Sequence, residues 1–282
     1  MKIAITSEST IDLNANLLQA YDIKVIPFEI VLGNKTIKDG DRTNAEIFEF
    51  VDKNNILPKT NALNDFEYGE FFESVLKNYD CVIHIAMSSG LTSSCGNAIR
   101  VAKEMQNVYV IDSESLTSGM ALLAMYAREL ANKGLTPEEI VSKVEERKTK
   151  IQVSFVVERL DYLHKGGRCS SLAMFGANLL KLRPRIVMSE GRLTSDKKYR
   201  GLMSSVVSKY SQDVLQDFNT PDLNKVFITF SSATPEMIEA AREVCEGAGF
   251  KNIYEATAGC TVASHCGANT MGIIYFNDGG EE

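Results

Sequence analysis

Strand-like and helix-like segments alternate through the first half of the chain, and this order restricts the fold more than any other feature. Residues 2–6, 81–87 and 108–113 are short, apolar and rich in β-branched side chains, as buried strands are. Residues 66–77 and 116–130 carry apolar side chains at helical spacing. Because strands that alternate with helices pair in parallel, this half predicts a Rossmann-like α/β domain, a parallel sheet with helices on both faces.

The other segments of the first half are assigned from the same patterns. Residues 24–32 form one strand-like run, in which Pro27 marks a sheet edge or a bulge. Residues 58–61 are predicted to be a loop, and the charged segment 136–150 is predicted to be a solvated connecting helix. Two further helices are expected at 14–20 and 44–54.

The second half has a less regular order of strands and helices and predicts an α+β domain. A chain of 282 residues exceeds the size at which one core usually keeps growing. We therefore expect two domains, 1–150 and 151–282, with approximate boundaries and with segments that can be exchanged between them. The strands expected in the second half are 153–157, 185–189, 225–231, 253–258 and 271–276, and the helices are 159–165, 173–182, 202–216 and 235–248.

Composition and charge argue against several classes of protein. A net charge of −7 and a pI of about 5.2 disfavour a nucleic-acid surface, which needs clustered positive charge. No apolar run is long enough to cross a membrane, and the N-terminus lacks the architecture of a signal peptide. The six cysteines include no C-x-x-C pair, so we expect reduced thiols in a cytoplasmic protein, with neither a disulfide framework nor a zinc site.

A hydroxyl-rich turn at residues 87–98 separates a strand-like run from a helical one. Ser88, Ser89 and Gly90 stand where the strand would end. A helix that starts within this turn presents unpaired N–H groups, which can bind a carboxylate or a phosphate. An ordinary serine-rich helix cap is the simpler interpretation of these residues taken alone.

The position of this turn in the predicted sheet strengthens its case as a site. Three polar turns, at 7–10, 88–94 and 112–118, each follow a predicted parallel strand. Ligands in such sheets bind at the carboxyl ends of the strands, where these turns would converge. The hydroxyl-rich turn is therefore a candidate binding site.

Two other patches carry candidate polar groups. Arg168 follows two glycines and could hold a carboxylate or a phosphate through its planar guanidinium, although a helix end followed by a surface arginine is the simpler reading. His265 lies in a predicted turn, 259–267, among small residues that suit a ring presented at a pocket, although a lone histidine is more often structural. His84 is expected in the core and His164 on a helix surface.

Several common catalytic motifs are absent. There is no G-x-S-x-G nucleophile elbow, no Walker loop, and no G-x-G-x-x-G after the first strand. The residues alone indicate a two-domain α/β protein with a hydroxyl-lined anion or carboxylate site. The alternative from another functional class is a small-molecule hydrolase or acyltransferase that uses Ser89 or Ser113 with His265.

Six short segments together suggest a family. They are 7–13 (SESTIDL), 57–60 (LPKT), 87–92 (MSSGLT), 110–113 (VIDS), 162–168 (YLHKGGR) and 264–267 (SHCG). In this order they resemble the DegV family, the bacterial fatty-acid-binding proteins that serve as FakB-type subunits of fatty acid kinase. The resemblance extends over nearly the whole chain.

The resemblance implies a long-chain fatty acid in a tunnel between the two domains. Hydroxyls of Thr60 and Ser89 would hold its carboxylate, helped by the backbone N–H of Gly90. His265 and Arg168 would lie near the carboxylate at the surface, where in the family a separate ATP-dependent kinase subunit phosphorylates the fatty acid to an acyl phosphate. The protein would then be a lipid-binding subunit without turnover of its own.

The resemblance also completes the expected site and shows where this chain departs from the family. Ser9 and Ser88 are further expected ligand-binding residues, no metal ion or cofactor is expected, and contact with a membrane would be transient. Glu8 stands where the family usually has Asp, residues 61–63 replace Ser-Gln-Pro, and residues 92–93 replace Ser-Gly. These departures are expected to affect ligand length or partner choice.

Overall fold

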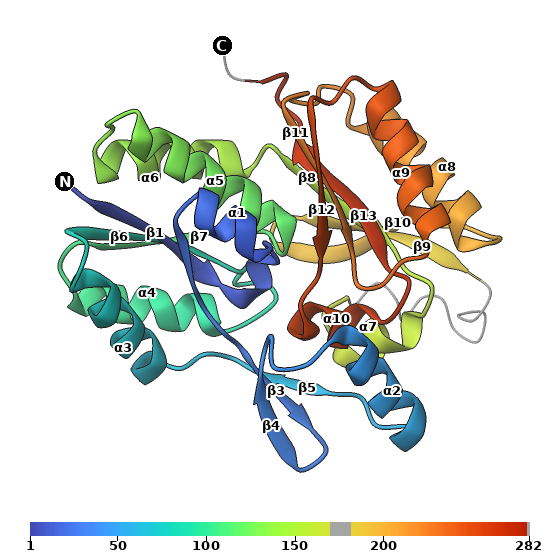
Figure 1. Ribbon diagram of the computed structural model, residues 1–282, viewed down its shortest axis with the longest axis horizontal. Coiled ribbons are helices and arrows are strands. Elements are labelled where there is room, and N and C mark those ends of the chain that lie inside the picture. Colours follow the sequence, from blue (N-terminus) through green and yellow to red (C-terminus); the bar gives the residue numbers. More distant parts are fainter. Residues whose placement is uncertain (170–181, 281–282) are drawn as a thin grey trace.

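The computed structural model describes residues 1–169 and 182–280, which form three sheets and the helices around them (Figure 1). The first sheet has the order β2-β1-β6-β7, and every pair in it is parallel, which confirms the sheet predicted for the first half. Side chains of β1 and β6 are buried at every position, because both faces of the sheet are covered. The strands are β1 (Ile3–Glu8), β2 (Ile23–Ile26), β6 (Cys81–Ala86) and β7 (Val108–Asp112).

Helices cover both faces of this sheet (Figure 1). Helices α3 and α4 lie on one face, and α1, α5 and α6 lie on the other. The expectation of a solvated connector at 136–150 is wrong, because Ile140 and Val144 of α6 are fully buried against α5 and β7. The bounds are α1 (Ala15–Ala20), α3 (Asp65–Leu76), α4 (Ser94–Glu104), α5 (Ser118–Asn132) and α6 (Pro137–Lys148), with a short 3-10 helix η1 (Ser9–Ile11).

The second sheet has the order β10-β9-β8-β13-β11-β12 and is mixed, since only β11 and β12 pair in parallel. Helices α8 and α9 cover its outer face (Figure 1), and its inner face shares a core with α5. The α+β order predicted for the second half is confirmed, although β10 was not predicted because its sequence is mostly polar. The bounds are β8 (Ile151–Val156), β9 (Arg183–Ser189), β10 (Arg192–Tyr199), β11 (Lys225–Phe230), β12 (Asn252–Thr257), β13 (Met271–Phe276), α8 (Met203–Asp217) and α9 (Pro235–Gly247).

A third, smaller sheet with the order β4-β3-β5 corrects two predictions. The single strand expected at 24–32 is broken at Pro27, so that β2 belongs to the first sheet and β3 to the third. The loop expected at 58–61 contains β5, which pairs with β3. The bounds are β3 (Glu29–Leu32), β4 (Lys35–Lys38), β5 (Lys59–Asn61) and α2 (Asn44–Asn54).

This third sheet brings the first half of the chain against the second (Figure 1). Ile30 and Ile47 form a small core with Cys260 of α10 (Cys260–Cys266). Residues 259–267, expected to be a turn, therefore contain a helix, and α10 packs in turn on α7 (Leu160–Gly166). The division at residue 150 stays a prediction.

Three remaining expectations concern one helix of the second half, the cysteine thiols and membrane-spanning segments. The helix expected at 173–182 lies outside the described residues, apart from Leu182. All six cysteines are free and buried. Among residues 1–169 and 182–280, none of the helices combines the length and apolar composition needed to cross a lipid bilayer.

Candidate functional site

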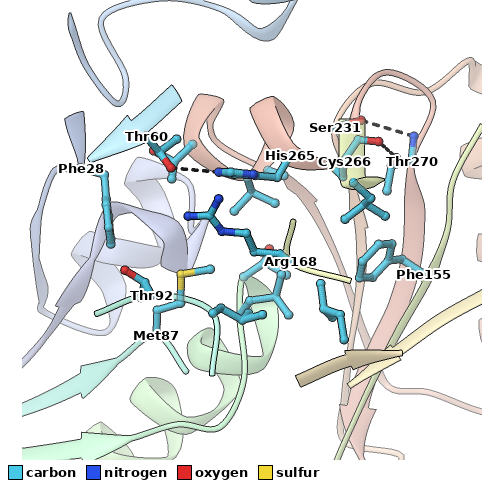
Figure 2. Close-up of a pocket in the computed structure, with 18 of the residues that line it drawn as sticks. Phe28, Thr60, Met87, Thr92, Phe155, Arg168, Ser231, His265, Cys266 and Thr270 are labelled. Atoms are coloured by element: carbon cyan, nitrogen blue, oxygen red, sulfur yellow. Dashed lines mark hydrogen bonds between the residues drawn. The ribbon is translucent and has the colours of Figure 1, made fainter. Parts of the chain in front are cut away.

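A cavity of about 520 Å³ lies where the first sheet, the second sheet and α10 meet. This volume is in the ordinary range for small-molecule sites, which is roughly 300–1,000 Å³. Figure 2 shows Phe28, Met87 and Phe155 at its wall. The apolar side chains around it come from both halves of the chain and include Phe28, Met87, Leu116, Phe155, Leu193 and Ile274.

A hydrogen-bonded pair stands in the wall of this cavity. The hydroxyl of Thr60 on β5 lies 2.9 Å from Nε2 of His265 on α10 (Figure 2). Burial, and secondarily the nearby Arg168 guanidinium, lowers the pKa of His265 from 6.5 to about 4. The imidazole is therefore neutral at pH 7, and its buried Nδ1 has no hydrogen-bond partner.

Arg168 is held beside this pair by the glycine-rich end of α7. Gly167 adopts a left-handed conformation with φ 71°, which ends the helix. A Cβ atom on Gly166 would lie 2.8 Å from Nδ1 of His265, so glycine permits α7 to approach the histidine this closely. Arg168 is exposed, lines the cavity, and donates a 2.6 Å hydrogen bond to the carbonyl of Gly166.

The hydroxyl-rich turn lies at the cavity, but much of its hydrogen-bonding capacity is used in holding the fold together. Ser88 is buried, and its Oγ donates to the carbonyl of Gly191 at 2.7 Å. The N–H of Gly90 donates to the same Oγ, so the donor that the resemblance assigned to a carboxylate is engaged within the turn. Helix α4 begins at Ser94, within the predicted strand-to-helix turn. Ser89 is exposed and lines the cavity.

The structure thus brings together five of the seven expected site residues at one cavity, namely Thr60, Ser89, Gly90, Arg168 and His265. Ser88 and Ser9 lie outside the cavity wall. Ser9 donates to Asp39 at 2.9 Å and accepts from the N–H of Phe28, so it holds the chain where β2 leads to β3.

Other candidate residues have structural surroundings. Ser113, of the hydrolase alternative, is fully buried, and its Oγ bonds to the backbone of Ser115. His84 lies in the core and His164 on an exposed helix face, as predicted. The described part of the chain holds no group of three side chains of the kinds that bind metal ions.

The sequence reasoning missed four threonines in the cavity wall, Thr117, Thr229, Thr261 and Thr270. Thr261 precedes His265 by one helical turn on α10. This spacing would have indicated it, had the segment been recognised as a helix. Thr117 stands in one of the three polar turns but was not singled out there.

Comparison with known proteins identifies the family. A family model described as an uncharacterised protein of the DegV family matches residues 2–278. A DegV domain-containing protein of Caldanaerobacter subterraneus subsp. tengcongensis is 29% identical over 279 residues, which cover 97% of this chain and 98% of that protein. A protein of Thermotoga maritima named as a fatty acid-binding protein is 29% identical over 285 residues, covering 96% of each.

A solved structure agrees with these relatives. The crystal structure of DegV from Bacillus subtilis, described as a fatty acid binding protein, matches with a TM-score of 0.85 at 25% identity and covers 98% of this chain and 99% of that one. The order of the six segments had already indicated the same relationship. The chain belongs to the DegV family.

Proposed function

We propose that this protein binds a long-chain fatty acid in the cavity and presents its carboxylate to an ATP-dependent kinase subunit for phosphorylation to an acyl phosphate. In this role it has no turnover of its own. The observation that carries the proposal is an apolar cavity in which the Thr60–His265 pair and the Arg168 guanidinium stand side by side. The names of the relatives as fatty-acid-binding proteins support the same ligand.

The apolar wall supplies affinity, and the polar residues supply orientation. Burying each methylene contributes about 0.8 kcal/mol, so roughly fourteen methylenes could contribute on the order of 10 kcal/mol. Association costs reduce this figure, and a remainder of about −8 kcal/mol corresponds to a micromolar affinity. A carboxylate removed from water needs a partner, and the Thr60 hydroxyl can donate to it while accepting from the Nε2–H of His265.

The hydrolase alternative has less support from the geometry. It requires a serine hydroxyl against His265, whereas Nε2 of His265 is bonded to Thr60. Ser113 is bonded within its own turn and is not part of the cavity wall. Ser89 lines the cavity, but among the described residues no hydrogen bond joins it to His265.

Native mass spectrometry of the purified protein separates the two functions. Binding predicts a co-purified mass that matches a long-chain fatty acid and is lost under denaturing conditions. A hydrolase or acyltransferase predicts an acyl group that stays covalently attached to serine. A preparation that, after delipidation, fails to take up any fatty acid would refute the proposal.

Thr60→Val tests the position of the carboxylate. Loss of one hydrogen bond to a charged group costs roughly 1.5–3 kcal/mol, so we expect about ten- to a hundredfold weaker fatty-acid binding by calorimetry. Thr36→Val is the matched control, because Thr36 is exposed on β4, away from the cavity. Equal affinities of the two variants would contradict the placement of the carboxylate at Thr60.

Arg168→Ala tests presentation to the kinase, which would act in the cytoplasm, where ATP is available. Because Arg168 is exposed, we expect its removal to weaken binding much less than Thr60→Val does, but to prevent ATP consumption by the cognate kinase. Arg168→Lys should restore activity only in part, because an ammonium lacks the planar fork. Normal kinase turnover per bound fatty acid in Arg168→Ala would refute this role.

A further inference from the structure

Two threonine hydroxyls in the cavity wall are buried without a hydrogen-bond partner. Thr117, at the start of α5, and Thr261, on α10, are each 4% exposed, and both Oγ1 atoms lack a partner. The Thr117 hydroxyl does not cap α5. Buried polar groups without a partner are uncommon because they are costly, and when they face a cavity they indicate a bound group that would satisfy them.

A third unpartnered atom lies next to these hydroxyls. Asp12 is 7% exposed; its Oδ1 accepts a 2.7 Å hydrogen bond from the N–H of Gly259, whereas its Oδ2 has no partner. The Thr117 hydroxyl gives this carboxyl a weak hydrogen bond that opposes the effect of burial on its pKa, in a geometry that falls short of a regular hydrogen bond. Asp39 accepts from the N–H of Thr261 at 3.4 Å and lies beside Gly259 as well. The two threonines therefore adjoin one pair of aspartates.

The aspartates decide which chemical group fits here. Burial, together with the charge of Asp39, raises the pKa of Asp12 well above its usual value, and the same two factors disfavour an anionic group of the ligand at this place. A neutral hydroxyl can donate to one of these oxygens and accept from another. A methylene group of the ligand would leave the two threonine hydroxyls and the Oδ2 atom of Asp12 without a regular hydrogen bond.

The position of Thr261 on α10 shows which part of the ligand it would contact. Thr261 and His265 are four residues apart on one face of α10, and both line the cavity. Neighbouring turns of a helix are about 5.4 Å apart. A group bound by Thr261 would therefore belong to the part of the acyl chain close to its carboxylate.

We propose that Thr117 and Thr261 form a polar subsite for a hydroxyl group on the carboxyl-proximal part of the acyl chain, so that the preferred ligand is a hydroxylated long-chain fatty acid. This inference rests on the proposed fatty-acid-binding function and adds the class of ligand to it. One neutral hydrogen bond corresponds to a preference of roughly three- to tenfold.

The test compares stearic acid with a panel of monohydroxystearic acids that differ only in the position of the hydroxyl. Affinities for the full-length, delipidated protein are measured by calorimetry. We expect one isomer with a carboxyl-proximal hydroxyl to bind roughly three- to tenfold more tightly than stearic acid, and isomers with distal hydroxyls to bind more weakly. If every isomer binds no better than stearic acid, the subsite holds at most water and the proposal is wrong.

Substitutions assign the preference to the two threonines. Thr117→Val and Thr261→Val keep the side-chain shape and should abolish the ratio between the preferred isomer and stearic acid. Thr60→Val should weaken both ligands together and leave the ratio intact, as should the control Thr36→Val. A ratio that survives both subsite substitutions would overturn the assignment. Failure of stearic acid itself to bind would instead refute the proposed function.

Discussion

His265 should resist protonation in the folded protein, and this resistance should make the fold sensitive to acid. A fall of its pKa from 6.5 to about 4 corresponds to about 3 kcal/mol of stability between the two protonation states. The unfolded chain takes up this proton as the pH falls below about 6.5, whereas the folded protein does so only near pH 4. The contribution is therefore complete above about pH 6.5, is reduced by about 2 kcal/mol at pH 5, and is lost near pH 4.

The assay is urea unfolding of the parent, His265→Gln and His164→Gln at about pH 7.5 and about pH 5. The glutamine amide keeps a polar group near Thr60 but does not titrate. His164 is an exposed histidine and serves as the control. We expect the stability of the parent relative to His265→Gln to fall by about 2 kcal/mol between the two pH values, and its stability relative to the control to stay nearly constant.

Two outcomes would refute the reasoning. One is the same pH dependence in all three proteins. The other is an NMR titration of the His265 ring near pH 6.5, which the presence of only three histidines in the chain makes easy to assign. Either result would mean that burial and Arg168 do not disfavour the imidazolium as the structure indicates.

Two further substitutions test the packing around the site and the contact between the two halves. Gly90→Ala would place a Cβ atom against the carbonyl oxygen of Gly191. We therefore expect the free energy of unfolding in urea to fall by about 1–3 kcal/mol and fatty-acid binding to weaken. Unchanged stability would contradict the close contact between the two glycines. Arg147→Met removes the ion pairs to Asp222 at 2.9 Å and Asp278 at 2.8 Å and leaves two largely buried carboxylates without their cation. We therefore expect the free energy of unfolding at neutral pH to fall by about 3–5 kcal/mol. A variant as stable as the parent would show that these ion pairs do not hold α6 to the second half.

Local patterns in the sequence determined most of the elements. The strands β1, β6 and β7 were predictable because strands buried on both faces are continuous apolar runs. Their alternation with helices then indicated a parallel sheet before any contact was known. The sequence patterns failed where the polarity or size of the side chains is not typical of the element they form. Strand β10 is mostly polar because much of it is exposed, and the small residues of α10 resembled those of a turn.

The site depended on contacts that no local pattern encodes. Thr60 and His265 are 205 residues apart and meet only because Pro27 sends the chain out of the first sheet into a third, which packs on α10. The serine-rich turn read correctly as polar, but its Ser88 hydroxyl bonds to Gly191, 103 residues away. Residue type determines which hydrogen bonds a side chain can form. Which of them it forms, and how far burial shifts its pKa, depends on the groups that folding brings within a few ångströms, and these come from segments distant in the chain.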